Sequence, residues 1–208
     1  MQPHRIQARF LIELPPAVSL ASVVPVFHRW IQVGRTGELL LDVADYRHVH
    51  HGPGIVLVGH EADYAVDTAG GRVGLRYVRK RSPSDSLSGA IRQAVGAAAK
   101  GARWLVEDMG LGTDYIGAGS FELVIVDPLH YPNDDANLWR VAKALSRIFL
   151  SAGVQAPHVA RTIADPRASL SLQVTMAGIK DIRAYEALGV EGVDSAVTAQ
   201  TEGQHEIA

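Results

Sequence analysis

The chain has 208 residues, with 20 Lys and Arg against 22 Asp and Glu, nine His and no Cys. This length suffices for one large domain or two small ones, and an apolar fraction of 47% excludes a fully disordered chain. The absence of Cys excludes disulfides, thiolate zinc sites and cysteine nucleophiles.

A formal net charge of -2 gives the chain no general attraction to nucleic acid or anionic membranes. No apolar run approaches the roughly 20 residues that a membrane-spanning helix needs. The first ten residues, MQPHRIQARF, lack the apolar core of a signal peptide. These features predict a soluble, cytoplasmic protein that has neither nucleic acid nor membrane as its partner.

The first predicted element is a strand over His4–Leu14, which ends at Pro15 because proline cannot donate to a sheet ladder. A helix is predicted over Ser22–Val33, where apolar residues recur at helical spacing, and Gly34 ends it.

Three strands of a meander follow, over Glu38–His50, Ile55–Asp67 and Arg72–Arg81. The turns between them, at residues 51–54 and 68–71, are rich in the glycine that tight turns require.

The rest of the chain alternates helices and strands up to residue 188. The predicted elements are a helix over Ser84–Asp108, a strand over Phe121–Asp127, a helix over Asp134–Ser151, strands over His158–Ala164 and Ala168–Thr175, and a helix over Ile179–Leu188. Residues 190–208 form a polar tail with few apolar side chains, which predicts a mobile segment.

The predicted order is β-α-β-β-β-α-β-α-β-β-α, and the adjacent hairpins favour a mainly antiparallel sheet with the helices packed on one face. We therefore expect an α+β fold, part of which could form a ferredoxin-like split β-α-β unit. Residues 1–189 are predicted to form a single domain, and residues 190–208 its tail.

The meander is predicted to place one polar row on an otherwise apolar sheet face. With the turns assigned above, Asp45 lies opposite His60, and His60 lies opposite Arg79. The functional hypothesis is a catalytic site in which Asp45 orients His60, His60 acts as the acid and base, and Arg79 holds an anionic group. The alternative is a buried polar network that only determines strand register.

The other face of the meander is predicted to carry charges of alternating sign. The residues of this ladder are Asp42, Glu61, Asp63, Asp67, Arg72 and Arg76. A solvated face that contributes little stability is the favoured interpretation. A carboxylate site for a cation, built on Asp42, Glu61 and Asp63, is the alternative.

Four of the nine histidines lie between residues 48 and 60. Ligands from His48, His50, His51 and Glu61 could hold a divalent metal, with zinc, manganese or iron favoured because no thiolate is present. The competing and favoured expectation is that these are surface histidines with no specific metal.

A second polar constellation follows the strand predicted to end at Asp127. Asp127 and His130 belong to the stretch Asp-Pro-Leu-His-Tyr-Pro, in which both Asp-Pro and Tyr-Pro are turn signals. We expect an ordinary turn here, with a chemical role as the alternative.

Residues 42–80 carry a pattern of aspartate, glycine and aromatic positions, including Asp42-Val-Ala-Asp-Tyr46, His48, Gly52-Pro-Gly54, Gly59-His-Glu61, Tyr64, Asp67, Gly70-Gly-Arg72, Gly74-Leu75, Tyr77 and Arg79-Lys80. This stretch resembles a group of uncharacterised bacterial proteins of cyanobacterial type. The group has no established activity, so the resemblance implies no function, and His50-His51 departs from its pattern.

Two functions follow as hypotheses. The first is a small enzyme or ligand-binding protein that uses Asp45, His60 and Arg79, with an unknown small-molecule ligand. The alternative is a non-catalytic homo-oligomer, with a dimer as the default. It rests on a stripe of small residues in the second long helix that would allow close helix packing: Ala94, Ala97, Ala98, Ala99 and Ala102.

Overall fold

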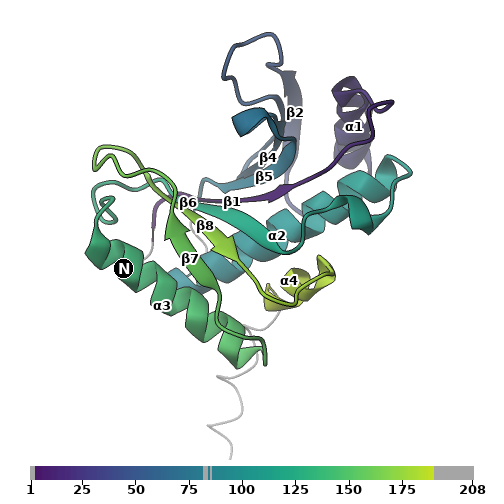
Figure 1. The fold of residues 1–208 in the computed structure, drawn as a ribbon. Coiled ribbons are helices and arrows are strands. Elements are labelled where there is room, and N and C mark those ends of the chain that lie inside the picture. The colour runs from purple at the N-terminus through teal and green to yellow at the C-terminus, as the bar shows by residue number, and fades with distance from the viewer. Residues whose placement is uncertain (1–2, 82–83, 85, 190–208) are drawn as a thin grey trace, which may run out of the picture.

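A computed structural model describes residues 3–81, 84 and 86–189 (Figure 1). The predicted tail at residues 190–208 lies outside the described residues. The described strands form one eight-stranded sheet in the spatial order β2-β3-β4-β5-β1-β6-β8-β7. They are β1 (Ile6–Leu11), β2 (Leu40–Asp45), β3 (Ile55–Gly59), β4 (Ala62–Asp67), β5 (Gly74–Arg79), β6 (Ser120–Ile125), β7 (His158–Arg161) and β8 (Leu170–Thr175).

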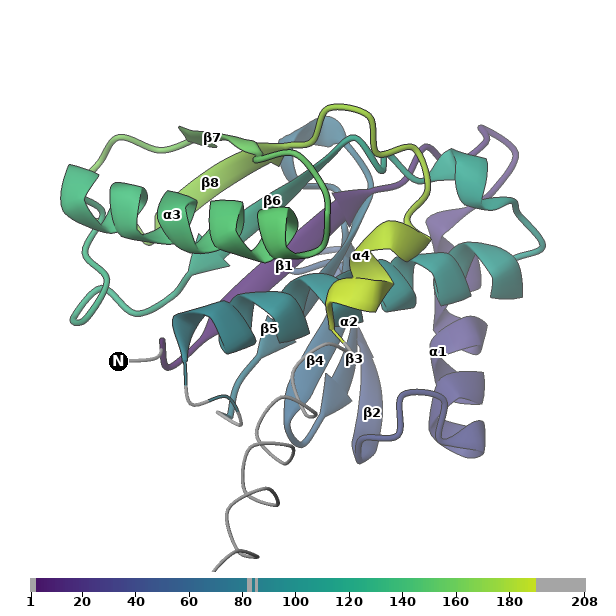
Figure 2. The same cartoon turned by 90° about the horizontal axis from the view of Figure 1, so that it is seen from below.

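Each pair of neighbouring strands is antiparallel. The helices are α1 (Val23–Val33), α2 (Leu87–Asp108), α3 (Asp135–Ser151) and α4 (Arg183–Leu188). Figure 2 shows all four helices on one side of the sheet, with α2 running along it. The predicted α+β class with a mainly antiparallel sheet is confirmed.

The meander contains one more strand than the sequence pattern predicts. The stretch expected as a single strand over residues 55–67 divides into β3 and β4 at a tight turn. A Cβ at Gly59 would lie only 2.3 Å from the Ala62 carbonyl oxygen, so the chain reverses where it has no side chain. Asp63 Oδ1 accepts a hydrogen bond from Gly59 N at 3.1 Å, and Lys80 Nζ donates one to Gly59 O at 2.6 Å.

The predicted registers of the hairpins are wrong as well, because the connections begin or end at other residues than predicted. Asp45 pairs with Ile55, because Tyr46 N donates to Gly54 O at 2.8 Å and closes the hairpin well before residue 51. Asp67 pairs with Gly74, because a short 3-10 turn at Ala69–Gly71 lengthens the second connection. We call residues 46–54 the histidine loop and residues 68–73 the glycine turn.

One face of the sheet is covered by the helices and forms the core. Phe10, Tyr77 and Leu123 are fully buried on the adjacent strands β1, β5 and β6. They face α2, whose contacts with β1 and β5 are extensive. Gly101 on α2 allows close packing, since a Cβ there would lie 2.9 Å from the Tyr64 ring.

The alanine stripe of α2 is covered by this same chain. Four of its residues, Ala94, Ala98, Ala99 and Ala102, have no exposed surface, and Ala97 is half-buried. On α2, Gly96 approaches α4 so closely that its Cβ would lie 3.0 Å from the Cα of Gly189. The stripe is therefore explained by packing inside the chain and gives no support to a subunit contact.

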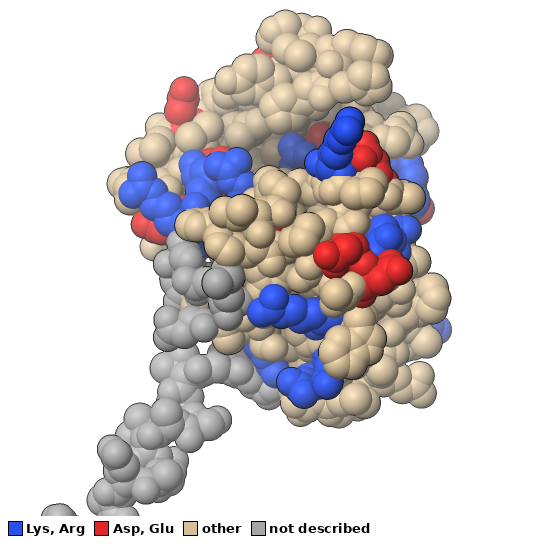
Figure 3. Space-filling view, turned by 90° about the vertical axis from the view of Figure 1, so that its left-hand side faces the viewer, with Lys and Arg blue, Asp and Glu red and all other residues tan. Residues whose placement is uncertain are grey.

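None of the helices in the described residues lies on the opposite face of the sheet, and we call it the open face. Arg9 lies on this face between its cross-strand partners Arg76 and Glu122. The histidine loop and the glycine turn lie at one end of it. Figure 3 shows a hollow below the uppermost part of the molecule, with side chains of both charges on its wall.

Candidate functional site

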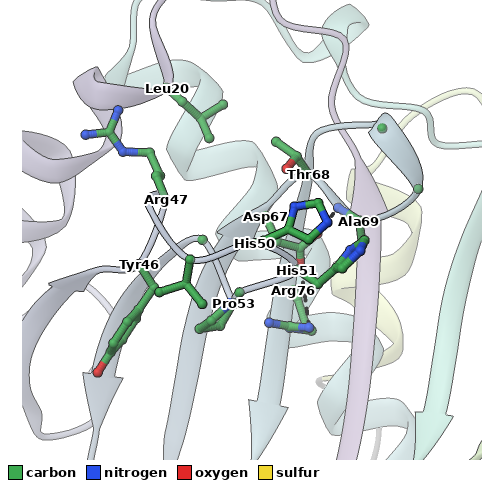
Figure 4. Close-up of a pocket in the computed structure, with 15 residues that line it drawn as sticks. Leu20, Tyr46, Arg47, His50, His51, Pro53, Asp67, Thr68, Ala69 and Arg76 are labelled. Carbon is green, nitrogen blue, oxygen red and sulfur yellow. Dashed lines mark hydrogen bonds and ion pairs between the residues drawn. The ribbon is translucent and has the colours of Figure 1, made fainter.

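A cavity of about 820 Å³ lies between the histidine loop and the glycine turn (Figure 4). Strands β4 and β5 deliver Asp67 and Arg76 to its inner wall, and the loop delivers His50 and His51. Cavities of this size hold drug-sized or nucleotide-sized molecules in other proteins. This pocket is therefore the candidate site that the fold presents.

A buried charge cluster supports the inner wall of the pocket. Asp67 is 2% exposed and Arg9 is 5% exposed, and Arg9 Nε lies 3.0 Å from Asp67 Oδ1. Arg76 Nη1 lies 3.4 Å from the other carboxylate oxygen of Asp67. Two guanidinium groups thus share one carboxylate, and that carboxylate is inaccessible to a further cation.

Arg9 is held from several sides. Its Nη1 donates to Glu122 Oε1 at 3.0 Å, and its Nη2 donates to the backbone carbonyl oxygens of Ala69 and Arg72 at 3.3 and 2.5 Å. A Cβ at Gly74 would lie 2.6 Å from Arg9 Nε, so only glycine lets the guanidinium lie across β5. These contacts attach the glycine turn to the sheet.

Arg76 is held much more loosely than Arg9. Its side chain is 25% exposed, and its Nε is buried with no hydrogen-bond partner among the described residues. Asp67 Oδ2, which lies 3.4 Å from Arg76 Nη1, also has no hydrogen-bond partner in the described part of the chain. The part of the guanidinium that is exposed beside the cavity is a suitable group to bind an anion.

The histidine loop holds two imidazoles over this wall. The His50 and His51 rings have their centroids 3.9 Å apart, and Figure 4 shows both rings beside the Asp67–Arg76 pair. His51 has a φ of 56°, a backbone conformation that residues other than glycine rarely adopt. Gly54, with a φ of 78°, would place a Cβ 2.1 Å from Val66 O, so the loop closes against β4 only with glycine there.

Asp45 binds Arg47 of this same loop and not the histidine predicted as its partner. Arg47 donates to both carboxylate oxygens of Asp45, from Nε at 2.9 Å and from Nη2 at 2.6 Å. These hydrogen bonds lower the pKa of the Asp45 carboxyl to about 2. Arg47 is among the residues that line the pocket, and Asp45 holds its guanidinium.

The predicted catalytic row of Asp45, His60 and Arg79 is wrong as a geometric arrangement. Asp45 lies at the end of β2 that adjoins the pocket, whereas His60 lies in the turn between β3 and β4, at the opposite end of the hairpin. The extra strand break at Gly59 causes this, because it removes His60 from the strand that was to carry it.

Arg79 does lie close to the turn that contains His60. Its Nη1 donates to Glu38 Oε1 at 2.7 Å and to the Tyr77 hydroxyl at 3.2 Å, while its Nη2 is 3.5 Å from Glu61 Oε2. His60 Nδ1 is 2.9 Å from Glu61 Oε1. Burial raises the pKa of Tyr77 to about 12, so its hydroxyl stays neutral. This cluster fits the alternative that was open for Arg79, a polar network with a structural role.

The predicted metal ligands are not brought together. His48, His50 and His51 belong to the histidine loop, while Glu61 follows the far end of β3. Within residues 3–81, 84 and 86–189, no group of three or more His, Asp and Glu side chains has a geometry that could hold a metal ion. The separation follows from the hairpin register, which places the two turns at opposite ends of β3.

The predicted charge ladder is correct only in part. Asp63 is partly exposed and pairs with Lys80 Nζ at 2.7 Å, as expected of a surface pair. Asp67 is buried, so the expectation of a fully solvated ladder is wrong there. The partner of Asp67 that the sequence pattern did not indicate is Arg9, which lies on β1, a strand distant in sequence from β4.

Asp127 and His130 form both the predicted turn and a polar contact. Tyr131 N donates to Asp127 O at 2.8 Å, and His130 Nδ1 lies 3.0 Å from Asp127 Oδ1. Burial acts to raise the pKa of the Asp127 carboxyl, but hydrogen bonds from His4 N and from His130 outweigh it, so this pKa is lowered. The carboxylate thus anchors His130 and the start of β1.

Sequence reasoning missed Arg9, Arg76 and the pairing of both with Asp67 as site features. The signal that could have indicated the pocket is the glycine pattern, with Gly52 and Gly54 in one connection and Gly70-Gly71 in the next. Glycine-rich connections predict close backbone approach, but a three-stranded meander would place these two at opposite ends, and only the extra turn at Gly59 brings them to the same end.

Comparison of the chain with family models, curated proteins and solved structures finds no match to any of them. No helix in the described part of the chain has the length and apolar character needed to cross a membrane.

Proposed function

We propose that the protein binds a small anionic molecule, carrying a carboxylate or phosphate group, in the pocket between the histidine loop and the glycine turn. The observation that carries this proposal is Arg76, which lines the pocket with a side chain that is 25% exposed and whose contact with the shared carboxylate of Asp67 is as long as 3.4 Å. An anionic group in the pocket would supply acceptors for the exposed part of this guanidinium.

The charges of the pocket wall favour an anion over a cation. Arg47 and Arg76 line the cavity, and Asp67 is the single acidic residue among the described residues that line it. Asp67 already contacts two guanidinium groups and is 2% exposed. A cationic ligand would therefore find no free carboxylate.

The pocket also offers apolar and imidazole surface. Leu20, Val49 and Pro53 line it together with His50 and His51. A ligand with an apolar or aromatic part beside its anionic group would use both kinds of surface. The imidazoles are the acid–base groups nearest to such a ligand, which is the role that a small enzyme would need.

Isothermal titration with three probes, citrate, inorganic phosphate and adenosine monophosphate, tests the proposal. We expect at least one probe to bind, and Arg76→Gln to weaken its binding about tenfold or more, because a charged hydrogen bond is worth about 1.5–3 kcal/mol. Arg161→Gln is the matched control, since Arg161 is a partly exposed arginine far along the sheet that pairs with Asp135. Equal losses in the two variants, or no binding of any probe, would contradict the proposal.

Assembly into a homo-oligomer is the second candidate, and one observation favours it. Strand β2 is at an edge of the sheet. Leu39, just before this strand, is 62% exposed, and Leu41, within it, is 53% exposed. Exposed apolar residues on an unpaired edge favour pairing with a second copy. Sedimentation of the protein at micromolar concentration tests this, and a monomer would end it.

A further inference from the structure

The outward face of α3 combines exposed apolar residues with a row of cations. Trp139 is 63% exposed and Leu150 is 58% exposed. Arg140, Lys143 and Arg147 are exposed on the same helix. At 3.6 residues per turn, these five positions fall on one stripe about a third of the helix circumference wide.

This stripe borders a cleft between α3 and the first turn of α2. The cleft has a volume of about 230 Å³ and is lined by Trp139, Lys143 and Arg147 on one side and by residues 86–88 on the other. No acidic side chain of the described residues lines it. The described residues that line the cleft therefore carry only positive charge, although the whole chain carries a net charge of -2.

The three cations have no carboxylate partner in the described part of the chain. Lys143 Nζ lies 4.5 Å from the centre of the Trp139 ring, and the Arg140 guanidinium lies 4.8 Å from that of Tyr131. By contrast, the nearby Arg161 pairs with Asp135 at 2.6 Å. Like charges at helical spacing repel one another, so an external anion would stabilise this face.

We propose that this face of α3 docks an acidic segment of a partner protein. A carboxylate of the segment enters the cleft between the serine hydroxyls of α2 and the cations of α3, and a neighbouring apolar side chain covers Trp139. Tryptophan and arginine are the residue types that contribute most at protein interfaces.

The geometry favours a peptide over the two other large anionic partners. Arg140 and Arg147 are seven positions apart, which is about 10 Å along a helix, too short to follow a nucleic-acid backbone over a usual site. A concave cleft does not match the flat surface of a bilayer. The proposal is independent of the pocket on the open face, since the two share no residue.

Fluorescence anisotropy with a short fluorescein-labelled peptide of alternating Glu and Phe tests the proposal on the full chain. We expect binding that weakens at least tenfold when Gln replaces Glu in the peptide. The double variant Lys143→Glu with Arg147→Glu should show a similar loss. Trp139→Ala should also weaken binding several-fold, although it leaves the charge unchanged.

The matched control is Arg167→Glu with Lys180→Glu, which makes the same charge change at exposed positions elsewhere. An equal loss in this control would show general electrostatic attraction and overturn the proposal. Unchanged binding by Trp139→Ala, with its fold verified by circular dichroism, would also overturn it. So would tighter binding of an oligothymidylate, or of phosphatidylserine vesicles, than of the peptide.

Discussion

Arg9 reaches across the neighbouring strand β5 to pair with Asp67, with Nε 3.0 Å from Oδ1. The guanidinium passes over Gly74, where a Cβ would lie 2.6 Å from that nitrogen. This ion pair joins β1 to the end of β4. Two further hydrogen bonds from Arg9 attach the glycine turn that borders the pocket.

Replacing Asp67 with Asn should destabilise the protein strongly. The substitution leaves the buried Arg9 with only the partly exposed Glu122 as a countercharge, and breaking a buried pair in this way costs about 3–5 kcal/mol. Urea denaturation measures the free energy of unfolding. Asp63→Asn is the matched control, because the partly exposed Asp63–Lys80 pair should cost about 1 kcal/mol or less. Similar costs in the two variants would contradict a structural role for the Arg9–Asp67 pair.

Replacing Gly54 with Ala should open the histidine loop. Its φ of 78° disfavours a side chain, and the new Cβ would collide with the Val66 carbonyl oxygen. We expect a loss of about 2 kcal/mol or more in unfolding free energy, together with loss of anion binding in the pocket. Gly119→Ala, at a position with open space around it, should change neither property. Retained anion binding by Gly54→Ala would show that the loop conformation is not needed.

Asp127 should make the stability of the protein depend on pH. Because hydrogen bonds hold its pKa in the folded state below the usual value of 3.8, the folded state binds fewer protons than the unfolded state as the carboxyl titrates. Its stabilising effect is therefore complete above about pH 4 and is lost as the pH falls through the lowered pKa.

The variant Asp127→Asn tests this dependence. At pH 7 it should cost about 1–3 kcal/mol, as expected for hydrogen bonds to a charged group. The difference from the native protein should shrink as the pH falls below about 4. Denaturation at a series of pH values measures it, with the exposed Asp114→Asn as the control. A difference that does not vary with pH would contradict the role of the Asp127 charge.

Tyr185 should attach α4 to the connection that precedes β6 through its hydroxyl. Burial raises the pKa of this fully buried tyrosine, and its hydroxyl donates to the Ala118 carbonyl oxygen at 2.6 Å. Tyr185→Phe should cost about 1 kcal/mol, since the carbonyl loses its partner while the ring packing remains. Thermal unfolding measures the change, and the exposed Tyr46→Phe provides the matched substitution. A change in unfolding temperature no larger than that of Tyr46→Phe would show that the Tyr185 hydrogen bond adds nothing to stability.

The sequence by itself determined the fold class and the presence of the four helices, although α2 and α4 begin at Leu87 and Arg183, later than the predicted Ser84 and Ile179. The periodic apolar positions of α1 and α3 predict boundaries that agree with the structure within one residue at each end. Helix periodicity and the proline and glycine signals at element ends are local properties, so they can be read without knowledge of the partners. The antiparallel arrangement followed from the short connections between strands.

Only the tertiary structure decided the registers and therefore the site. The turn at Gly59 continues the alternation of the strand before it, so the pattern did not reveal that the chain reverses there. A shift in register changes which residues face one another, and this separated Asp45 from His60. Arg9 joined Asp67 because β1 lies beside β5 in space, a pairing between segments that are distant in sequence and that no local pattern encodes.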